Sequence, residues 1–437
     1  MKTPTTYQRE IASVVASDVL SQRGSEFTVE MPLGAGVTEL VSQLEMLVMS
    51  VNVNAGGASL RVVPEVQADV KGRLIRHLRG SSLKGLWSDG RECVRLGRAE
   101  VMYAAPEDLR RMDGRFELIQ AVDAHLLSPF EMSRLREIAG ASGATLVFYG
   151  RPWNGETPFE QVKLTNRQAS TGEVRRHCRV PLDRVKAELP GYEGRVDVER
   201  ERLGEAHPEF ETGYALRPVF TGAPAFPREL LRALFGSGGP RRLGEAGSLT
   251  ASVVVTRVPE AGVFHGTGAM AVVTVASRTT GGLRVLDHKW IEAADAPSLV
   301  GGIKRFVEKV WPCENLLARV RGRDDGQVKG LLEQSLKPGC VRWLPETSRQ
   351  RERESSAVTA AALTARLSFY APDGSIEYRA LRREMDWAVL RLSESRGFVV
   401  AVEGQDEGFL EGVSMLASED AEQAGEQQMA FPIAMAS

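Results

Sequence analysis

The sequence predicts an α/β protein with two domains. Helical and strand-like segments alternate from about residue 5 to 165, which is typical of a largely parallel sheet covered by helices. After a stretch rich in glycine and proline at 222–247, a second series of strands and helices begins. With 437 residues, the chain is long enough for two or three domains with hydrophobic cores.

In the first series, apolar periodicity sets the elements. We expect helices at 7–22, 38–50 and 66–79, and strands at 27–31, 59–63, near 93–103, at 116–122 and at 145–149. Residues 181–217 are charged and helical in pattern. The first domain is therefore expected at 1–220, followed by a linker at 221–247.

In the second series, three antiparallel-looking strands precede alternating helices and strands. The strands are expected at about 249–258, 269–277, 283–290, 315–320, 341–343 and 396–402, and the helices at 297–310, 326–335 and 355–367. This pattern predicts a second α/β domain at 248–417. The tail at 418–437 has no clear periodicity and is expected to be flexible.

Composition narrows the class of protein. The net charge is −2, and no apolar run approaches the ~18–20 residues needed to cross a bilayer. The first residues lack an apolar secretory core, so we expect a cytoplasmic protein without a membrane partner. The four cysteines, Cys93, Cys178, Cys313 and Cys340, lack the spacing of a zinc site, and no structural metal is expected.

One basic neighbourhood precedes residue 100, and it favours a solvated face with interspersed acids over a nucleic-acid patch. Its members are Lys71, Arg73, Arg76, Arg79, Lys84, Arg91, Arg95 and Arg98.

The most informative motif lies at residues 27–39, where a strand pattern runs into a glycine loop and then a helix pattern. A phosphate-binding loop needs glycines, a lysine for the outer phosphates and a Ser/Thr hydroxyl for magnesium. Gly34, Gly36 and Thr38 are present, but Val37 occupies the lysine position. Taken alone, the loop is better explained as a structural glycine turn.

Together, the segments resemble the large subunit of phage DNA-packaging terminases over nearly the whole chain. The resemblance rests on the adenine-side Tyr7-Gln8, the loop at 27–45, the second nucleotide strand at 118–123, the coupling motif with Tyr149, Gly150, Pro152 and Trp153, and the motor-to-nuclease link at 199–214. It implies an ASCE-type P-loop ATPase domain followed by an RNase H-like nuclease-fold domain.

The resemblance also shows where the ATPase residues depart from the family. Asp123 remains at the magnesium position, but Ala124 stands where a glutamate should activate water. Without that glutamate and the lysine, we expect slow or undetectable hydrolysis, and ATP with Mg²⁺ only as residual ligands. His125 is expected to be a partly exposed loop residue rather than a catalytic one.

The nuclease residues depart in the same way. The family's first carboxylate belongs to the strand at 250–256, which contains no acid, and its second belongs to 316–322, where arginines stand. Only Asp406 and Glu407 remain, at the start of the final helix. One acidic corner cannot hold two metal ions, so no metal is expected there.

Two neighbouring acidic segments have simpler explanations. Asp324 and Asp325 fit a turn better than a substitute metal site. Residues 349–354, Arg-Gln-Arg-Glu-Arg-Glu, mix charges of both signs and predict a solvated helix start.

Three hypotheses follow. The first is a pseudoenzyme related to terminase large subunits, associated with viral DNA packaging and acting through double-stranded DNA, portal or capsid proteins, or an active terminase subunit. The second is an active, divergent packaging ATPase that takes a basic residue from elsewhere, such as Arg151 or Arg9. The third is a structural or interaction protein of a domesticated prophage.

Overall fold

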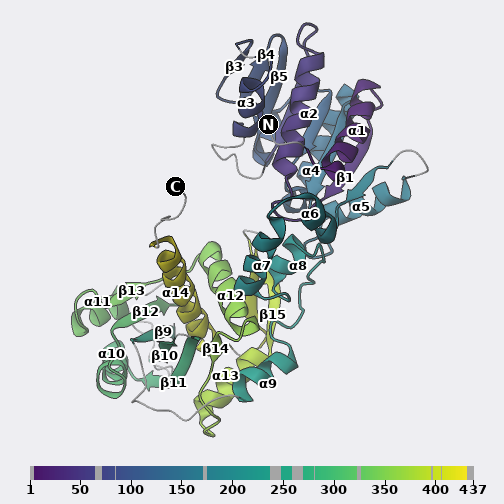
Figure 1. Cartoon of the computed structure of the whole chain (residues 1–437). Coiled ribbons are helices and arrows are strands. Elements are labelled where there is room, and N and C mark those ends of the chain that lie inside the picture. Colours follow the sequence, from purple (N-terminus) through teal and green to yellow (C-terminus); the bar gives the residue numbers. More distant parts are fainter. Residues whose placement is uncertain are drawn as a thin grey trace, which may run out of the picture. The chain divides into compact units, whose positions relative to one another are not determined.

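The computed structural model describes residues 4–63, 71–83, 85–170, 175–236, 248–257, 269–279, 281–321, 326–394, 397–404 and 406–430. The chain divides into two compact units, which Figure 1 shows. Unit 1 comprises Met1–Glu199 and Pro208–Phe220, and unit 2 comprises Arg200–His207 and Thr221–Ser437. Both units are built from one main sheet with helices on its two faces.

Unit 1 contains an eight-stranded sheet. Its spatial order is β3 (Trp87–Asp89), β4 (Cys93–Leu96), β5 (Ala99–Ala104), β2 (Ala58–Val62), β6 (Leu118–Ala121), β7 (Thr145–Gly150), β1 (Glu26–Glu30) and β8 (His177–Arg179). The strands from β5 to β8 in this order are parallel, and β3 and β4 add an antiparallel edge. Because β7 lies between β1 and β6, the predicted ASCE-type strand order is confirmed.

Helices cover both faces of this sheet. On one face lie α1 (Thr6–Leu20), α2 (Val37–Val51) and α3 (Gly72–Arg79), and on the other lie α4 (Pro129–Ser142) and α5 (Pro158–Gln168). Further along the chain come α6 (Leu182–Glu188), α7 (Tyr192–Leu203) and α8 (Pro208–Gly213), with 3-10 turns at Pro106–Arg111 and Ala124–Leu126. The sheet is thereby buried on both sides, as parallel sheets generally are.

Local sequence sets the start of α1 and both ends of α4. Thr5 and Gln8 form a capping box at the start of α1. Ser128 and Glu131 form another at α4, which ends at Gly143 in the left-handed region. These local signals set where the two helices begin and where α4 ends.

Unit 2 contains a six-stranded sheet with RNase H-like order, as the resemblance implied. The order is β13 (Val341–Trp343), β12 (Asn315–Val320), β9 (Leu249–Arg257), β10 (Ala269–Thr279), β11 (Gly282–Ala293) and β14 (Leu367–Ser368). β9, β10 and β11 are antiparallel neighbours, whereas β12 runs parallel to β9. A separate hairpin is formed by β15 (Ala388–Leu392) and β16 (Phe398–Val402).

The two faces of β9 meet different helices. Ala251, Val253 and Val255 belong to the apolar core with α10 (Ala296–Lys304), a π-helical turn at Arg305–Val310 and α11 (Gly326–Ser335). The opposite face meets α14 (Phe409–Ala430), which lies beside α12 (Ser348–Leu363) in Figure 1. α9 (Arg228–Gly236) and α13 (Ile376–Asp386) complete the described helices of this unit.

The structure corrects several expected elements. The strand near 93–103 is the hairpin of β4 and β5, and α4, α5, β8, α13 and β15 were not predicted. The expected linker contains α9, and its residues 237–247 lie outside the described residues. Of the tail expected to be flexible at 418–437, the part up to Ala430 belongs to α14, where Ser418 is buried and Glu419 pairs with Arg342, and 431–437 lie outside the described residues.

Among the described residues, no helix combines the length and the apolarity that a bilayer span requires.

We predict a pH-dependent term in the stability of unit 1 from Glu45 on α2. Its side chain is fully buried, 3.7 Å from Arg61, and burial raises its pKa to about 7 although Arg61 opposes the shift. The folded state keeps a proton that the unfolded chain releases, so stability falls as pH rises from about 4.5 to 7, by at most about 3 kcal/mol.

Thermal unfolding of Glu45→Gln and of the wild type between pH 4.5 and 8 measures this term. As pH rises, the melting temperature of the variant should increase relative to that of the wild type. Glu137→Gln, an exposed position on α4, serves as the control and should follow the wild type. Parallel curves for Glu45→Gln and the wild type would contradict the prediction.

Candidate functional sites

The glycine loop between β1 and α2 has the backbone of an anion-binding turn. Gly34 and Gly36 have φ values of 73° and 92°, in the left-handed region that favours glycine. Gly36 is the N-cap of α2 and brings no side chain to the N–H groups of the first turn. The positive end of the helix dipole and these N–H groups suit a phosphate.

Three side chains hold this loop by donating hydrogen bonds to its carbonyl oxygens. The bonds run from Tyr7 Oη to Ala35 O at 2.8 Å, from Gln8 Nε2 to Gly36 O at 3.1 Å, and from Tyr192 Oη to Leu33 O at 2.6 Å. α1 and α7 therefore fix the conformation of the loop from two sides.

The loop lines a cavity of about 1060 Å³. This volume is at the upper end of the range for small-molecule sites and is sufficient for a nucleotide. It collects most of the residues that the sequence indicated, namely Gln8, Gly34, Gly36, Val37, Thr38, Asp123, Tyr149 and Gly150. Among the described residues, Tyr7, Ala124, Pro152 and Trp153 are not part of its lining.

The cavity is rich in positive charge although Val37 replaces the lysine. Four arginines of the described residues line it: Arg73 and Arg76 on α3, Arg151 after β7, and Arg195 on α7. Arg73 lies 3.5 Å from Glu39 in the first turn of α2. His77 binds the same carboxylate at 2.9 Å, so Glu39 joins α3 to the start of the loop helix.

Asp123 and Arg151 face the cavity from the ends of β6 and β7. Asp123 has φ 52°, and burial raises its pKa while the charge of Arg151 opposes this. Arg151 lies 3.4 Å from Nε2 of His125 and stacks over Trp153. His125 is buried and not partly exposed as expected, and burial together with Arg151 lowers its pKa well below the usual value. At neutral pH it therefore carries no charge.

The predicted coupling residues tie the sheet to the loop helix. Tyr149 donates a hydrogen bond to Gln120 at 2.8 Å, and Gln120 donates to Val41 O on α2 at 3.3 Å. A Cβ atom at Gly150 would lie 2.7 Å from the Phe159 ring, so only glycine fits there. A movement of α2 would therefore act on β6 and β7 through these hydrogen bonds.

In unit 2, the face of β9 that meets α14 carries no acid. Ser252 donates a hydrogen bond to Gly412 O on α14 at 2.9 Å. A Cβ atom at Gly408 would lie 3.1 Å from Val254 and 3.2 Å from Thr256. This face of β9 therefore presents hydroxyl and methyl groups to α14.

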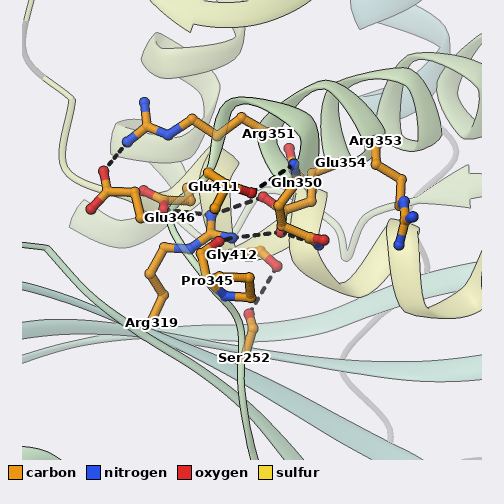
Figure 2. A network of polar contacts seen from close by, with 12 residues as sticks. Ser252, Arg319, Pro345, Glu346, Gln350, Arg351, Arg353, Glu354, Glu411 and Gly412 are labelled. Atoms are coloured by element: carbon orange, nitrogen blue, oxygen red, sulfur yellow. Dashed lines mark hydrogen bonds and ion pairs between the residues drawn. The ribbon is translucent and has the colours of Figure 1, made fainter. Parts of the chain in front are cut away.

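The end of β12 brings two arginines, Arg319 and Arg321, to the same side of the sheet. Arg319 is 2% exposed and forms a bidentate pair with Glu354 of α12 at 2.7 and 2.8 Å. The same guanidinium group donates to Glu411 of α14 at 2.9 Å and to Pro345 O at 3.2 Å, as Figure 2 shows. The helix start expected at 349–354 is present, and Arg349, Arg351 and Arg353 are exposed, but Glu354 is buried and not solvated.

Arg321, immediately after β12, binds the acids near the start of α14. It binds Asp406 at 2.9 and 3.0 Å and also binds Glu411. Burial is the largest single influence, and it would lower the pKa of Arg321 and raise that of Glu411. Glu411 and Asp406 together outweigh it and raise the pKa of Arg321, while Arg321 and Arg319 together lower the pKa of Glu411. Glu407 instead pairs with Arg383 at 2.8 Å. The two predicted acids therefore bind different arginines.

Comparison with known proteins yields structural matches alone. No protein-family model and no curated protein matches the sequence. The large terminase of a thermophilic bacteriophage matches with a TM-score of 0.62 at 11% identity, over 96% of this chain and 99% of that chain. Complexes of that phage terminase with ADP and with ATP-γ-S match with TM-scores of 0.60 and 0.58, each at 11% identity over 95% of this chain and 98% and 97% of theirs.

This chain has the fold of a phage large terminase. The match covers both units, so it includes the ATPase fold and the nuclease fold.

A large-terminase fold implies a two-metal site at the carboxyl end of the unit 2 sheet, and the residues present do not fit one. Within the described ranges, no three His, Cys, Asp or Glu side chains are arranged to hold a metal ion. Asp324 and Asp325 lie outside these ranges. The cavity of unit 1 fits a nucleotide better than unit 2 fits two metal ions, since Thr38, Asp123 and the start of α2 all line this cavity.

Several residues of both sites were missed by sequence reasoning. Glu39 and Arg195 carried no motif, and Arg73 and Arg76 were assigned to a solvated face although they line the cavity. Glu411 was missed in unit 2, although it follows the predicted pair Asp406 and Glu407 within a few residues. That proximity in sequence was the signal available for it.

We predict that the left-handed conformation of Gly36 is required for the loop. Gly36→Ala forces a Cβ into this conformation and against Gln8, which should lower the stability of unit 1 by about 1–3 kcal/mol. Gly140→Ala on the exposed face of α4 meets no atom within 4 Å, so it should be neutral or stabilising. Chemical denaturation of both variants compares them; equal effects would contradict the prediction.

Proposed function

We propose that this chain is a large-terminase-like component of viral DNA packaging whose ATPase and nuclease sites are both catalytically impaired. The proposal rests on one observation. At two sites, one in each unit, apolar or basic residues stand where the large-terminase resemblance expects catalytic charged residues. Val37 and Ala124 stand at the loop and at the end of β6, while Arg319 and Arg321 stand on β12.

For the ATPase, the cavity supports binding better than hydrolysis. Phosphoryl transfer depends on electrostatic stabilisation of the transferred group and on a positioned group that orients water. Ala124 provides no general base, and such a group typically contributes about 10²–10⁴-fold in rate. His125 next to it is buried and faces Arg151, and its lowered pKa makes it a weak base, so it does not replace the glutamate.

For the nuclease, the arginines oppose the reaction directly. A two-metal mechanism needs carboxylates free to bind both ions. Here Glu411 and Asp406 are bound by guanidinium groups. We infer that unit 2 acts as a binding or assembly domain, and that the chain acts in packaging through double-stranded DNA, portal or capsid proteins, or an active terminase subunit.

A second candidate is a divergent but active packaging ATPase, and the arginines of the cavity favour it. Arg151 lines the cavity close to Asp123, so it could supply the missing positive charge. Arg9 is exposed on α1, lies outside the described lining, and contacts Thr6. Of the two substitutes suggested by the sequence, Arg151 is therefore the one to test. The phage large terminase that shares this fold was solved with ADP and with ATP-γ-S.

The proposal predicts nucleotide binding without turnover. Titration calorimetry with ATP and Mg²⁺ should detect binding to the wild type, while phosphate release with DNA present stays at background. The double substitution Val37→Lys, Ala124→Glu should tighten binding and raise phosphate release at least about 10²-fold, because it restores the two missing charges. Cleavage of plasmid DNA with Mn²⁺ should be absent.

ATP hydrolysis by the wild type, or cleavage of plasmid DNA, would refute the proposal that the two sites are catalytically impaired. The second candidate then predicts that Thr38→Ala, Asp123→Ala and Arg151→Ala each remove the ATPase activity. Arg9→Ala is the matched control and should keep it. An ATPase insensitive to Arg151→Ala would dismiss the substitute-arginine mechanism.

A further inference from the structure

We propose that Arg319 and Arg321 take the place of the two metal ions in unit 2, so that this domain is a metal-independent version of a two-metal fold. The inference deepens the nuclease half of the proposed function and uses the fold for the expected position of the carboxylates. It concerns which cations hold β12, α12 and α14 together.

The positions of the two guanidinium groups support this assignment. They project from β12 at residues 319 and 321, on the face opposite Ala318 and Val320, which belong to the apolar core. On that face they meet α14 at its start, where the family's remaining acids belong. The cations are therefore placed between the strand and the helix that would otherwise share the metal ions.

The contacts of Glu411 resemble those of a carboxylate that bridges two cations. One oxygen, Oε1, accepts a hydrogen bond from Arg319 at 2.9 Å, and the other, Oε2, accepts from Nε of Arg321 at 2.8 Å. Each arginine also has a partner of its own. Arg319 forms a bidentate pair with Glu354, and Nη2 of Arg321 contacts both oxygens of Asp406. Two guanidinium groups and three carboxylates thus form one continuous network.

The charges leave little attraction for a further cation. Two positive groups against three negative groups leave a net charge of −1, whereas two divalent ions would add four positive charges beside fixed guanidinium groups. Arginine does not lose its proton in proteins and cannot be neutralised to admit a metal. A metal ion could enter only by displacing an arginine from its charge-assisted hydrogen bonds.

Manganese serves as the probe, with the full-length protein and without DNA or nucleotide. The melting temperature of unit 2 is measured in EDTA and in about 1 mM Mn²⁺, and electron paramagnetic resonance counts bound Mn²⁺. The wild type should show a change of less than about 1 °C and no bound ion, because a ligand stabilises only a state that it binds.

Arg321→Asp should create the site that the wild type lacks. It removes a positive charge and leaves three acids together at the start of α14, so it should melt below the wild type in EDTA. With Mn²⁺ its melting temperature should rise by about 5 °C or more, and one ion should be bound. Arg321 is chosen over Arg319 because its side chain is 22% exposed and the change is better tolerated.

Arg342→Ala is the matched control. Arg342 pairs with Glu419 and Glu422 further along α14. Glu422 keeps its ion pair with Arg353 at 3.0 Å, so the substitution removes a positive charge beside two acids far from the start of the helix. Its response to Mn²⁺ should equal that of the wild type. If Arg321→Asp does not fold, Arg321→Ala decides instead, and it should bind Mn²⁺ more tightly than the control.

Two outcomes overturn the inference. Stoichiometric Mn²⁺ binding by the wild type would mean that the guanidinium groups do not exclude metal. A response of the Arg321 variants no larger than that of Arg342→Ala would mean that this corner never had the geometry of a metal site. Neither outcome depends on packaging or ATP hydrolysis, so this inference and the proposed function can fail separately.

Discussion

A buried arginine needs anionic partners, and this constraint organises unit 2. Arg319 is almost fully enclosed on β12, where an uncompensated charge would be strongly destabilising. Removing one partner of such a pair typically costs about 3–5 kcal/mol. Glu354 and Glu411 must therefore stay beside it, which fixes α12 and α14 against the sheet and against each other.

The same face shows how the helix could come so close. Gly408 and Gly412 let α14 pack directly on Ser252, Val254 and Thr256, with no room for a larger side chain on the helix. Glu384 of α13 then accepts hydrogen bonds from the N–H groups of Glu407 and Leu410 at 2.7 Å each. Direct hydrogen bonds and ion pairs thus hold α12, α13 and α14 in place in unit 2.

Unit 1 depends on a different constraint, the strand order. Because β7 separates β1 from β6, the glycine loop and Asp123 open onto one edge of the sheet with a gap between them. The gap is a cavity lined by arginines from α3, α7 and the end of β7. The strand order thus leaves a cavity large enough for a nucleotide beside the glycine loop.

The sequence by itself determined the fold class, the glycine loop and the residues that are absent. Alternation of apolar residues and turn residues is local, so the strands around the loop and most of unit 2 could be predicted. The losses at Val37 and Ala124 are also visible in sequence, because each is defined by its position in a motif.

Only the tertiary structure decided which charges meet. Arg73, Arg195 and Arg151 lie far apart in sequence, and nothing local indicates that they line one cavity. Glu354 appeared solvated because a mixed-charge segment usually is, yet Arg319 draws it into the interior. The pairing of buried charges depends on contacts between residues far apart in sequence. Periodicity and composition are local properties of the sequence, so they cannot predict it.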